Sequence, residues 1–253
     1  MTELVHFSVS DGVATITLDS PPNRNALSPA LLTELSAGLA AAVADEAVRV
    51  IVLTHTGRVF CSGADLKATA AATGAGDMPI ASVPAVLTAL TESPKPVIAR
   101  IGGPARAGGI GLIAACDLTL AARSATFAFT EVRLGVVPAV ISRPVLPLLP
   151  RRAAQELFLT GEVFDAARAA EIGLLTRVVE DDDLDAEVAR YAGLLALGAP
   201  GALAATKELL AAPPADYETL QRLSADRFAG PEGREGIAAF AEKRRPSWAP
   251  PAP

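Results

Sequence analysis

Two runs of apolar residues on consecutive positions constrain the fold of this 253-residue chain more than any other feature. They are residues 48–55 (VRVIVLTH) and 95–103 (KPVIARIGG), both rich in Val and Ile. A strand that is apolar on consecutive positions must be covered on both faces, as in a parallel sheet packed between helices. Segments with helical spacing alternate with these runs, so the sequence predicts a layered α/β fold.

A hairpin and a helix are expected ahead of the first buried strand. Within residues 4–18, apolar and polar residues alternate on both sides of Asp11-Gly12, a pair that favours the positive φ angles of a tight turn. Ser28 and Pro29 then indicate a helix start, with Ser28 as the N-cap and Pro29 in the first turn. The chain therefore opens as strand, strand, helix.

Further along the chain, residues 117–122 and 126–130 are expected to form two more strands. Residues 68–82, rich in Ala, Gly and Thr, are predicted to form a loop or a weak helix. From about residue 140 onward, helical spacing prevails. This C-terminal part is small and apolar, so we expect it to pack on the rest of the chain or on a neighbouring subunit.

The composition argues against several classes of protein. The chain carries 22 Lys and Arg against 28 Asp and Glu, a net charge of −6, which disfavours nucleic-acid binding through a broad basic face. No apolar run reaches the length of a membrane span, and the first residues do not resemble a secretory signal. The two cysteines, Cys61 and Cys116, do not make a disulfide framework, which fits a reducing compartment. We therefore expect a cytoplasmic protein that binds neither nucleic acid nor membrane.

The glycine-rich segment at residues 105–117 (ARAGGIGLIAACD) admits three interpretations. The first is a dinucleotide-binding fingerprint, because residues 109–114 read Gly-x-Gly-x-x-Ala and Glu131 follows where a ribose-binding acid would lie. Against it, the strand over residues 97–101 does not run directly into the first glycine of the pattern. The second interpretation is close packing of a helix on a strand, which requires only small side chains.

The third interpretation is a site for developing negative charge. Gly108 opens the expected helix, whose first N–H groups have no partner within the helix. A second N–H group, that of Ala64, is expected at another helix start, after a turn at Gly63. Fixed donors of this kind in a dry site each stabilise an oxyanion by about 3–4 kcal/mol. Under this interpretation, Ala64 and Gly108 donate to a carbonyl oxygen of the ligand.

Six segments, in order along nearly the whole chain, resemble the enoyl-CoA hydratase/isomerase (crotonase) family: 21–28 (PPNRNALS), 59–67 (VFCSGADLK), 102–122 (GGPARAGGIGLIAACDLTLAA), 127–139 (FAFTEVRLGVVPA), 159–179 (LTGEVFDAARAAEIGLLTRVV) and 235–248 (EGIAAFAEKRRPSW). The resemblance implies an α/β fold with a core that is a spiral of ββα units, to which we assign residues 1–195. It also implies a helical C-terminal oligomerisation region, residues 196–253, which forms a homotrimer and often a hexamer.

The resemblance implies roles for individual residues at the reaction centre. The backbone N–H groups of Ala64 and Gly108 fall on the pair that holds a thioester oxygen as an oxyanion. Glu131 falls on the second of the two glutamates that hydratases of the family usually carry. The first glutamate falls on Gly111, which has no side chain to hold or activate water. The sequence therefore retains one carboxylate of the pair.

An apolar acyl pocket beside Glu131 would raise the pKa of that carboxyl group and suit it to proton transfer at C2 of an acyl thioester. The sequence alone would instead favour a solvated Glu131 near Arg133. Ser142 is a candidate for positioning water in place of the absent carboxylate. The candidate residues for the walls of the acyl pocket are Val136, Val137 and Ile141.

Gly111 leaves several reactions open. The leading hypothesis is an enoyl-CoA hydratase-like lyase, which adds water to a trans-2-enoyl-CoA and gives a 3-hydroxyacyl-CoA through a thioester enolate. The alternatives are a Δ3-Δ2-enoyl-CoA isomerase, an acyl-CoA decarboxylase and an inactive acyl-CoA-binding homologue. The resemblance implies no cofactor besides the coenzyme A of the substrate, and no spacing of His and Cys indicates a metal site.

Contacts with coenzyme A are also implied by the resemblance. Arg24 is the natural partner of the nucleotide phosphates, and Lys243 is expected to reach the CoA of a neighbouring subunit. The sequence alone would instead place Arg24 in a salt bridge of its loop and Lys243 at a solvated helix end. The full predicted set is Arg24, Ala26, Ser62, Asp65, Leu66 and Lys243.

Overall fold

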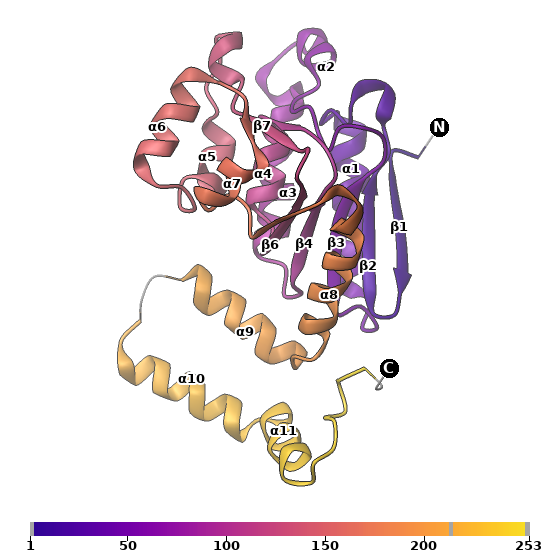
Figure 1. Ribbon diagram of the computed structural model, residues 1–253, viewed down its shortest axis with the longest axis vertical. Helices are drawn as coiled ribbons and strands as arrows, with labels where there is room; N and C mark the ends of the chain where they lie inside the picture. Colours follow the sequence, from indigo (N-terminus) through magenta and orange to yellow (C-terminus); the bar gives the residue numbers. More distant parts are fainter. Residues whose placement is uncertain (1–2, 213–214, 251–253) are drawn as a thin grey trace.

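A six-stranded sheet forms the centre of the molecule, in the order β1-β2-β3-β4-β6-β9 (Figure 1). The structure, a computed structural model, describes residues 3–212 and 215–250. β1 runs antiparallel to β2, and the other neighbours are parallel. The strands are β1 Val5–Ser10, β2 Val13–Leu18, β3 Val50–His55, β4 Val97–Ile101, β6 Leu118–Ala122 and β9 Arg177–Val179.

The opening of the chain follows its local signals. Asp11 and Gly12 have φ angles of 51° and 77°, as a tight turn between β1 and β2 requires. Helix α1 (Pro29–Ala44) begins after Ser28, whose side chain accepts a hydrogen bond from the N–H of Leu31. The predicted hairpin and helix start are both confirmed.

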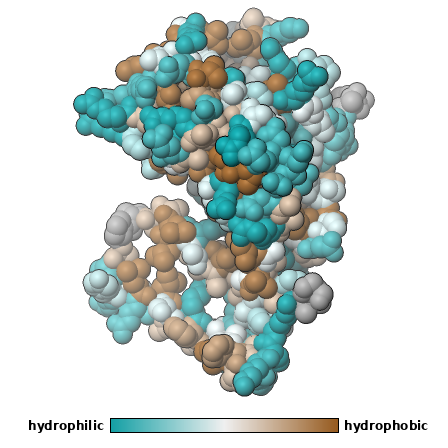
Figure 2. Space-filling model, in the orientation of Figure 1, coloured by the Kyte–Doolittle hydropathy of each residue, from teal (hydrophilic) through white to brown (hydrophobic). Residues whose placement is uncertain are grey.

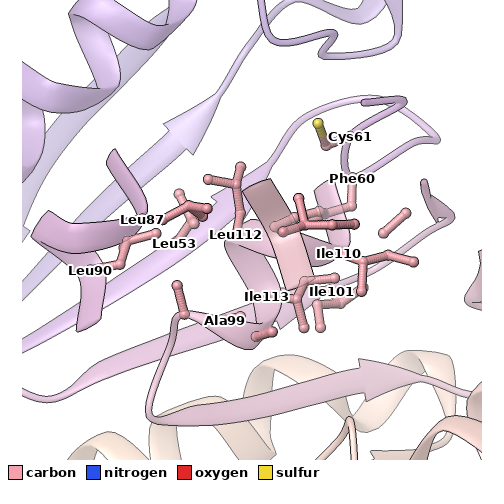
Figure 3. Close-up of a cluster of buried hydrophobic side chains, with 14 of the residues drawn as sticks. Leu53, Phe60, Cys61, Leu87, Leu90, Ala99, Ile101, Ile110, Leu112 and Ile113 are labelled. Atoms are coloured by element: carbon pink, nitrogen blue, oxygen red, sulfur yellow. The ribbon is translucent and has the colours of Figure 1, made fainter. Parts of the chain in front are cut away.

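Strand β3 is buried on both faces, as its sequence predicts. Val50 and Val52 belong to a core cluster that includes residues of helix α8 (Leu184–Ala196). Ile51 and Leu53 point to the other face, into the larger core under α1 and α3 (Val83–Thr91). Figure 3 shows part of this larger core, where Leu53 lies among side chains of α3 and of the glycine-rich helix α4 (Gly108–Ala114). The period of two along β3 thus divides its side chains between two helical layers.

A second, smaller sheet of order β5-β7-β8 lies beside the main one. Its strands are short: β5 Ala105–Arg106, β7 Thr126–Ala128 and β8 Phe164–Asp165. The remaining α-helices are α2 Leu66–Ala71, α5 Ala139–Val145, α6 Arg151–Thr160, α7 Ala166–Glu171, α9 Pro200–Ala211, α10 Tyr217–Ala229 and α11 Pro231–Ala241. The 3-10 helices are η1 Pro21–Asn23, η2 Ala75–Asp77, η3 Pro79–Ala81, η4 Glu131–Leu134 and η5 Asp181–Asp183. Residues 68–82, predicted as a loop or weak helix, hold the end of α2 followed by η2 and η3.

Polar contacts hold the C-terminal helices to the sheet. The guanidinium of Arg49 donates to the carbonyl oxygens of Gly198 and Trp248, at 2.8 and 2.9 Å. Lys207 of α9 contacts the carboxylate of Asp117 at 2.5 Å. Beyond these contacts, α9, α10 and α11 extend away from the main body of the molecule (Figure 1). Among the described residues no single helix is long and apolar enough to cross a bilayer, although α9 and the preceding helical stretch Asp181–Ala196, bent by 105°, pass that test together.

Large apolar side chains remain exposed on this C-terminal part (Figure 2). A cavity of about 850 Å³ opens between α9, α10 and α11, and Phe228, Ile237 and Trp248 contribute to its lining. The assignment of residues 196–253 to oligomerisation stays a prediction. The exposed apolar side chains are Leu209, Leu210, Tyr217, Phe228, Ile237 and Phe240.

Candidate active site

Three segments of the chain converge at the start of helix α4. A bridge between Cys61 and Ala105 places the segment 61–64 on one side of β5. On the other side, β7 pairs with β5 and brings Ala128 opposite Arg106. The small sheet thus brings residues 61–64 and the end of β7 toward the first turn of α4.

The first turn of α4 offers free backbone donors. The helix begins at Gly108, as predicted, and the N–H groups of Gly108 and Gly109 have no acceptor within the part of the chain that the structure describes. Ala107, the residue before the helix, has a φ of 48°, which is rare for a residue with a Cβ. Its N–H donates to the carbonyl oxygen of Ala128 at 3.1 Å, which fixes the end of β7 beside the helix. Buried N–H groups without an acceptor are rare in folded proteins, so Gly108 marks a candidate site.

Close packing also requires glycine at these positions. A Cβ on Gly108 would lie 2.8 Å from Cδ1 of Leu27, and a Cβ on Gly109 would lie 2.8 Å from Cβ of Cys61. Gly63 has a φ of 92°, and a Cβ there would lie 3.5 Å from the backbone nitrogen of Gly108. The packing interpretation of the glycines is therefore correct, and it coexists with the free N–H groups. Gly63 also places the neighbouring Ala64 close to the start of α4.

Ala64 is held by a strand-like bridge to Leu27 rather than by a helix start. The N–H of Leu27 donates to Gly63 at 2.8 Å, and Leu27 accepts from the N–H of Asp65 at 3.4 Å. The N–H of Ala64 itself has no acceptor among the described residues. The prediction of a helix start at Ala64 is wrong, because α2 begins at Leu66 after Asp65, which serves as its N-cap.

Glu131 begins the 3-10 helix η4, just after β7. Its Oε2 atom is buried and has no hydrogen-bond partner among the residues described. Burial raises the pKa of this carboxyl group, because an ionised carboxylate loses water there. Arg133 does not neutralise it, since its Nε donates to the carbonyl oxygen of Thr160 at 3.0 Å. The structure thus favours a partly buried Glu131 with one enclosed carboxyl oxygen over the solvated one that the sequence alone suggested.

The space in front of Gly111 is filled by a side chain from α5. A Cβ on Gly111 would lie 2.6 Å from Cγ2 of Ile141, whose side chain is 2% exposed. Ile141 therefore packs in the core, whereas Val136 and Val137 are 53% and 79% exposed. Ser142 donates its hydroxyl hydrogen to the carbonyl oxygen of Ala139 at 2.7 Å. Its hydroxyl is thus engaged within its own helix.

The predicted CoA contacts lie on two neighbouring segments, 24–26 and 62–66, with the exception of Lys243. The N–H of Ser62 donates to the carbonyl oxygen of Arg24 at 3.0 Å, beside the buried Ala26. The side chain of Arg24 is exposed and forms no ion pair within the described residues, so the expected loop salt bridge is not seen. Asp65 uses its carboxylate to cap α2, accepting from the N–H groups of residues 67 and 68, while Leu66 is 58% exposed.

Lys243 lies apart from this group. It follows α11, at the end of the molecule opposite α2 in Figure 1, and has a φ of 55°. The neighbouring Arg244 forms ion pairs with Glu235 and Glu242, at 2.7 and 2.6 Å. Within one chain the structure therefore does not bring Lys243 to the other predicted contacts.

Two residues of this site carried no assigned role in the sequence analysis: Asn25 and Leu27. Both lie within the segment 21–28, in which the resemblance implied CoA contacts for Arg24 and Ala26. Asn25 has a positive φ of 52°, a conformation in which Asn is enriched, and this preference was the available signal. The contacts of Leu27 with Gly63 and Gly108 are long-range, and no local pattern announces them.

Comparison with known proteins identifies the family of the chain. Residues 8–251 match the model of the enoyl-CoA hydratase/isomerase family. The chain is 33% identical over 252 residues to the rat mitochondrial enoyl-CoA hydratase domain-containing protein 3, covering 94% of this chain and 82% of the relative. It is 30% identical over 247 residues to the mevalonyl-coenzyme A hydratase sidH of Aspergillus fumigatus, covering 94% and 92%.

Solved structures give the same result. Pseudomonas aeruginosa AtuE superposes with a TM-score of 0.91 at 35% identity, covering 98% of this chain and all of the other. An enoyl-CoA hydratase of Mycobacterium smegmatis gives a TM-score of 0.89 at 34% identity, covering 98% and 99%. The protein therefore has the crotonase fold and belongs to the enoyl-CoA hydratase/isomerase family.

Proposed function

We propose that the protein is an enoyl-CoA hydratase, which adds water across the double bond of a trans-2-enoyl-CoA and releases a 3-hydroxyacyl-CoA. One observation carries the proposal: the carboxyl group of Glu131, whose buried Oε2 atom has no hydrogen-bond partner among the described residues, follows a strand that is tied to the start of α4. Two free N–H groups, those of Ala64 and Gly108, belong to the same junction of segments. Family membership makes an acyl-CoA thioester the expected ligand.

The N–H groups of Ala64 and Gly108 would donate to the thioester carbonyl oxygen. When water attacks C3, the electron pair of the double bond moves toward the carbonyl, and negative charge develops on that oxygen as an enolate. Fixed donors stabilise this charge more than they stabilise the neutral thioester, by about 3–4 kcal/mol per donor. The buried surroundings of Gly108 strengthen the effect, because little water competes for the oxygen.

Glu131 would carry out both proton-transfer steps of the reaction. As the ionised base, it takes a proton from the water molecule while the water oxygen forms its bond to C3. As the resulting acid, it returns that proton to C2 of the enolate, which completes the addition of water. A single carboxyl group can serve both steps because burial raises its pKa, which makes its protonated form easier to reach than that of a solvated carboxylate.

Isomerisation is the second candidate, and the packing of Ile141 against Gly111 favours it. No side chain at position 111 can hold a water molecule, and the space is closed by a hydrocarbon side chain. In this reaction Glu131 would remove a proton from C2 of a 3-enoyl-CoA and deliver it to C4, while the same oxyanion donors stabilise the dienolate. Decarboxylation and binding without turnover are the remaining alternatives.

The coenzyme A part of the ligand would lie along the segment from Arg24 to Ala26 and along Ser62, Asp65 and Leu66. Arg24 is exposed, and its charge is available for the nucleotide phosphates. We further propose a homotrimer or hexamer, because the C-terminal helices expose large apolar side chains that a neighbouring chain would cover. Lys243 would then reach the CoA of that neighbour, and no metal or redox cofactor takes part.

A panel of CoA thioesters tests the assignment. Purified protein is assayed with 2-enoyl, 3-enoyl and 2-carboxyacyl thioesters, following absorbance of the conjugated double bond and release of CO₂. We expect the highest kcat/KM with the 2-enoyl thioesters, followed as loss of the absorbance of their conjugated double bond. Faster appearance of conjugation from 3-enoyl thioesters would instead establish the isomerase, and release of CO₂ the decarboxylase. Tight binding of NAD(H) without binding of CoA would exclude all of these.

A further inference from the structure

Asn25 is a fully buried residue whose side-chain amide bonds to its own loop and to a second backbone segment. Its side chain is 0% exposed, and its Oδ1 accepts from the N–H of Ser20 at 2.7 Å. Its Nδ2 donates to the carbonyl oxygens of Thr56 and Val59, at 3.1 and 2.8 Å. The amide thereby ties the segment 20–27 to the segment that leads from β3 toward Cys61.

The backbone around Asn25 needs this support. Arg24 and Asn25 both have positive φ angles, 59° and 52°, so the chain turns sharply through a conformation that costs free energy for residues with a Cβ. Such a conformation persists where surrounding contacts determine it. Here the amide of Asn25 supplies three of those contacts.

Leu27, two residues further on, contacts both candidate donor segments. Its backbone brackets Ala64 through hydrogen bonds with residues 63 and 65. Its side chain is 1% exposed, and its Cδ1 is the atom that a Cβ on Gly108 would meet at 2.8 Å. One residue therefore touches the two peptide segments whose N–H groups must converge on one oxygen atom.

We propose that Asn25 is a positioning residue, which acts through Leu27 to set the relative placement of the Ala64 and Gly108 N–H groups. The inference rests on the proposed function only in that it takes these two N–H groups as the oxyanion donors. No other side chain type matches all three contacts. Asp would turn an oxygen toward the carbonyl oxygens of Thr56 and Val59, and Gly would keep the backbone conformation but lose every side-chain bond.

The test measures the thioester carbonyl without turnover. A saturated acyl-CoA labelled with ¹³C at its carbonyl has no double bond to react, and hydrogen bonds to the carbonyl oxygen lower its stretching frequency. Infrared difference spectra of the bound ligand are compared for the wild type, Asn25→Gly and Leu27→Val. Thr119→Val is the matched control, because Thr119 is another buried side chain that bonds to the backbone of a different segment.

We expect a lowered stretching frequency in the wild type and in Thr119→Val. In Asn25→Gly the shift falls by half or more and kcat falls at least tenfold, while KM changes less than kcat. Leu27→Val keeps the hydrogen bonds of Asn25 but removes the Cδ1 atom that packs against Gly108. We expect it to reduce the carbonyl shift by a smaller amount than Asn25→Gly. This second variant tests the same path if Asn25→Gly does not fold.

Two different failures are distinguishable. A folded Asn25→Gly or Leu27→Val protein that keeps the full carbonyl shift and the full kcat would overturn the positioning role while leaving the oxyanion donors in place. A wild-type protein without any carbonyl shift would overturn the donors themselves, and the positioning role with them. An equal loss of shift in Thr119→Val would show that general destabilisation, rather than Asn25, is responsible.

Discussion

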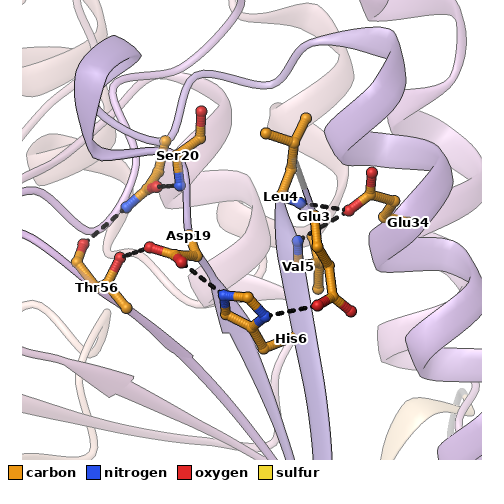
Figure 4. Close-up of polar contacts among 9 residues, drawn as sticks. Glu3, Leu4, Val5, His6, Asp19, Ser20, Glu34 and Thr56 are labelled. Atoms are coloured by element: carbon orange, nitrogen blue, oxygen red, sulfur yellow. Dashed lines mark hydrogen bonds and ion pairs between the residues drawn. The ribbon is translucent and has the colours of Figure 1, made fainter. Parts of the chain in front are cut away.

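Two carboxyl groups of this molecule, those of Glu131 and Asp19, have opposite surroundings. Oε2 of Glu131 is buried without a hydrogen-bond partner among the described residues, and burial raises the pKa of the group. Asp19 accepts a hydrogen bond from the hydroxyl of Thr56 and contacts Nε2 of His6 at 2.5 Å (Figure 4). The hydrogen bond from the Thr56 hydroxyl has the largest effect on the pKa of Asp19 and that from His6 the next, and both lower it.

The difference separates a group that fixes structure from one that is available for chemistry. Asp19 lies at the end of β2, and its partners join β1, β2 and the residue after β3 in one network. Every hydrogen bond that a carboxylate accepts stabilises its ionised form and removes it from proton transfer near neutral pH. Oε2 of Glu131 has no such partner among the described residues, so a ligand and its water are the groups left to interact with this oxygen.

Exchange of the two carboxylates for amides tests this contrast most strongly. We expect Glu131→Gln to lower kcat by about 10²–10⁴-fold, because the variant has no group to carry the proton. Its Tm at pH 8 should not fall below that of the wild type, since a neutral amide loses less hydration on burial than a carboxylate. The measurements are steady-state kinetics with a 2-enoyl-CoA and thermal denaturation.

Asp19→Asn is the matched control. It should retain activity within about twofold and lower the Tm, because the interaction of the carboxylate with His6 is lost. A comparable loss of activity in both variants would remove the distinction between the two carboxylates.

The pH dependence of activity should report Glu131 directly. The group must be ionised to accept a proton from water, so kcat/KM falls as pH decreases through its pKa. Because that pKa is raised above 4.5, the acidic limb of the profile lies above pH 4.5. Below the pKa, kcat/KM decreases by about tenfold per pH unit. The residual activity of Glu131→Gln should lack the limb. An unchanged limb in this variant would assign it to another group.

Adding a side chain at position 111 tests whether this position has room for a second carboxylate besides Glu131. Gly111→Ala would place Cβ at 2.6 Å from Cγ2 of Ile141, and overpacking of this kind costs about 1–3 kcal/mol of unfolding free energy. Ile141→Ala removes Cγ2 and by itself costs about 2–5 kcal/mol.

In the double variant we expect a loss smaller than the sum of the two single losses, measured by urea denaturation as a double-mutant cycle. Additive losses would mean that Ile141 does not close this position. The conclusion that position 111 has no room for a second carboxylate would then be wrong.

The smallest expected effect concerns the network of Asp19. Hydrogen bonds that His6 donates to the carboxylates of Asp19 and Glu3, in that order of effect, raise its pKa above 6.5. The stabilisation from protonated His6 is therefore present below pH 6.5 and lost as pH rises through the folded-state pKa. The stabilisation from ionised Asp19 is present above pH 3.8 and is lost as pH falls through its lowered folded-state pKa.

His6→Gln should accordingly lower the Tm slightly at pH 5.5 and less at pH 8.5, with kcat within about twofold of the wild type at both values. An equal change in Tm at the two pH values would show that the charge of His6 contributes nothing.

Local signals in the sequence predicted much of the fold. The Asp11-Gly12 turn, the Ser28 cap and the helix start at Gly108 depend on the conformational preferences of a few adjacent residues, and all three are present. The burial of β3 on both faces also followed from its own apolar residues. The helix start at Ala64 was wrong, because a bridge to Leu27, distant in sequence, holds that residue in an extended conformation.

The sequence by itself determined the family and the layered α/β fold, and it predicted Glu131 as the one retained glutamate of the family's pair. These follow from local periodicity, turn chemistry and motif order. Only the tertiary structure decided that Oε2 of Glu131 is buried without a hydrogen-bond partner among the described residues, that Ile141 closes the space at Gly111, and that Leu27 joins the two donor segments. Each of these is a contact between residues far apart in the chain, and such contacts are set by packing rather than by local conformational preference.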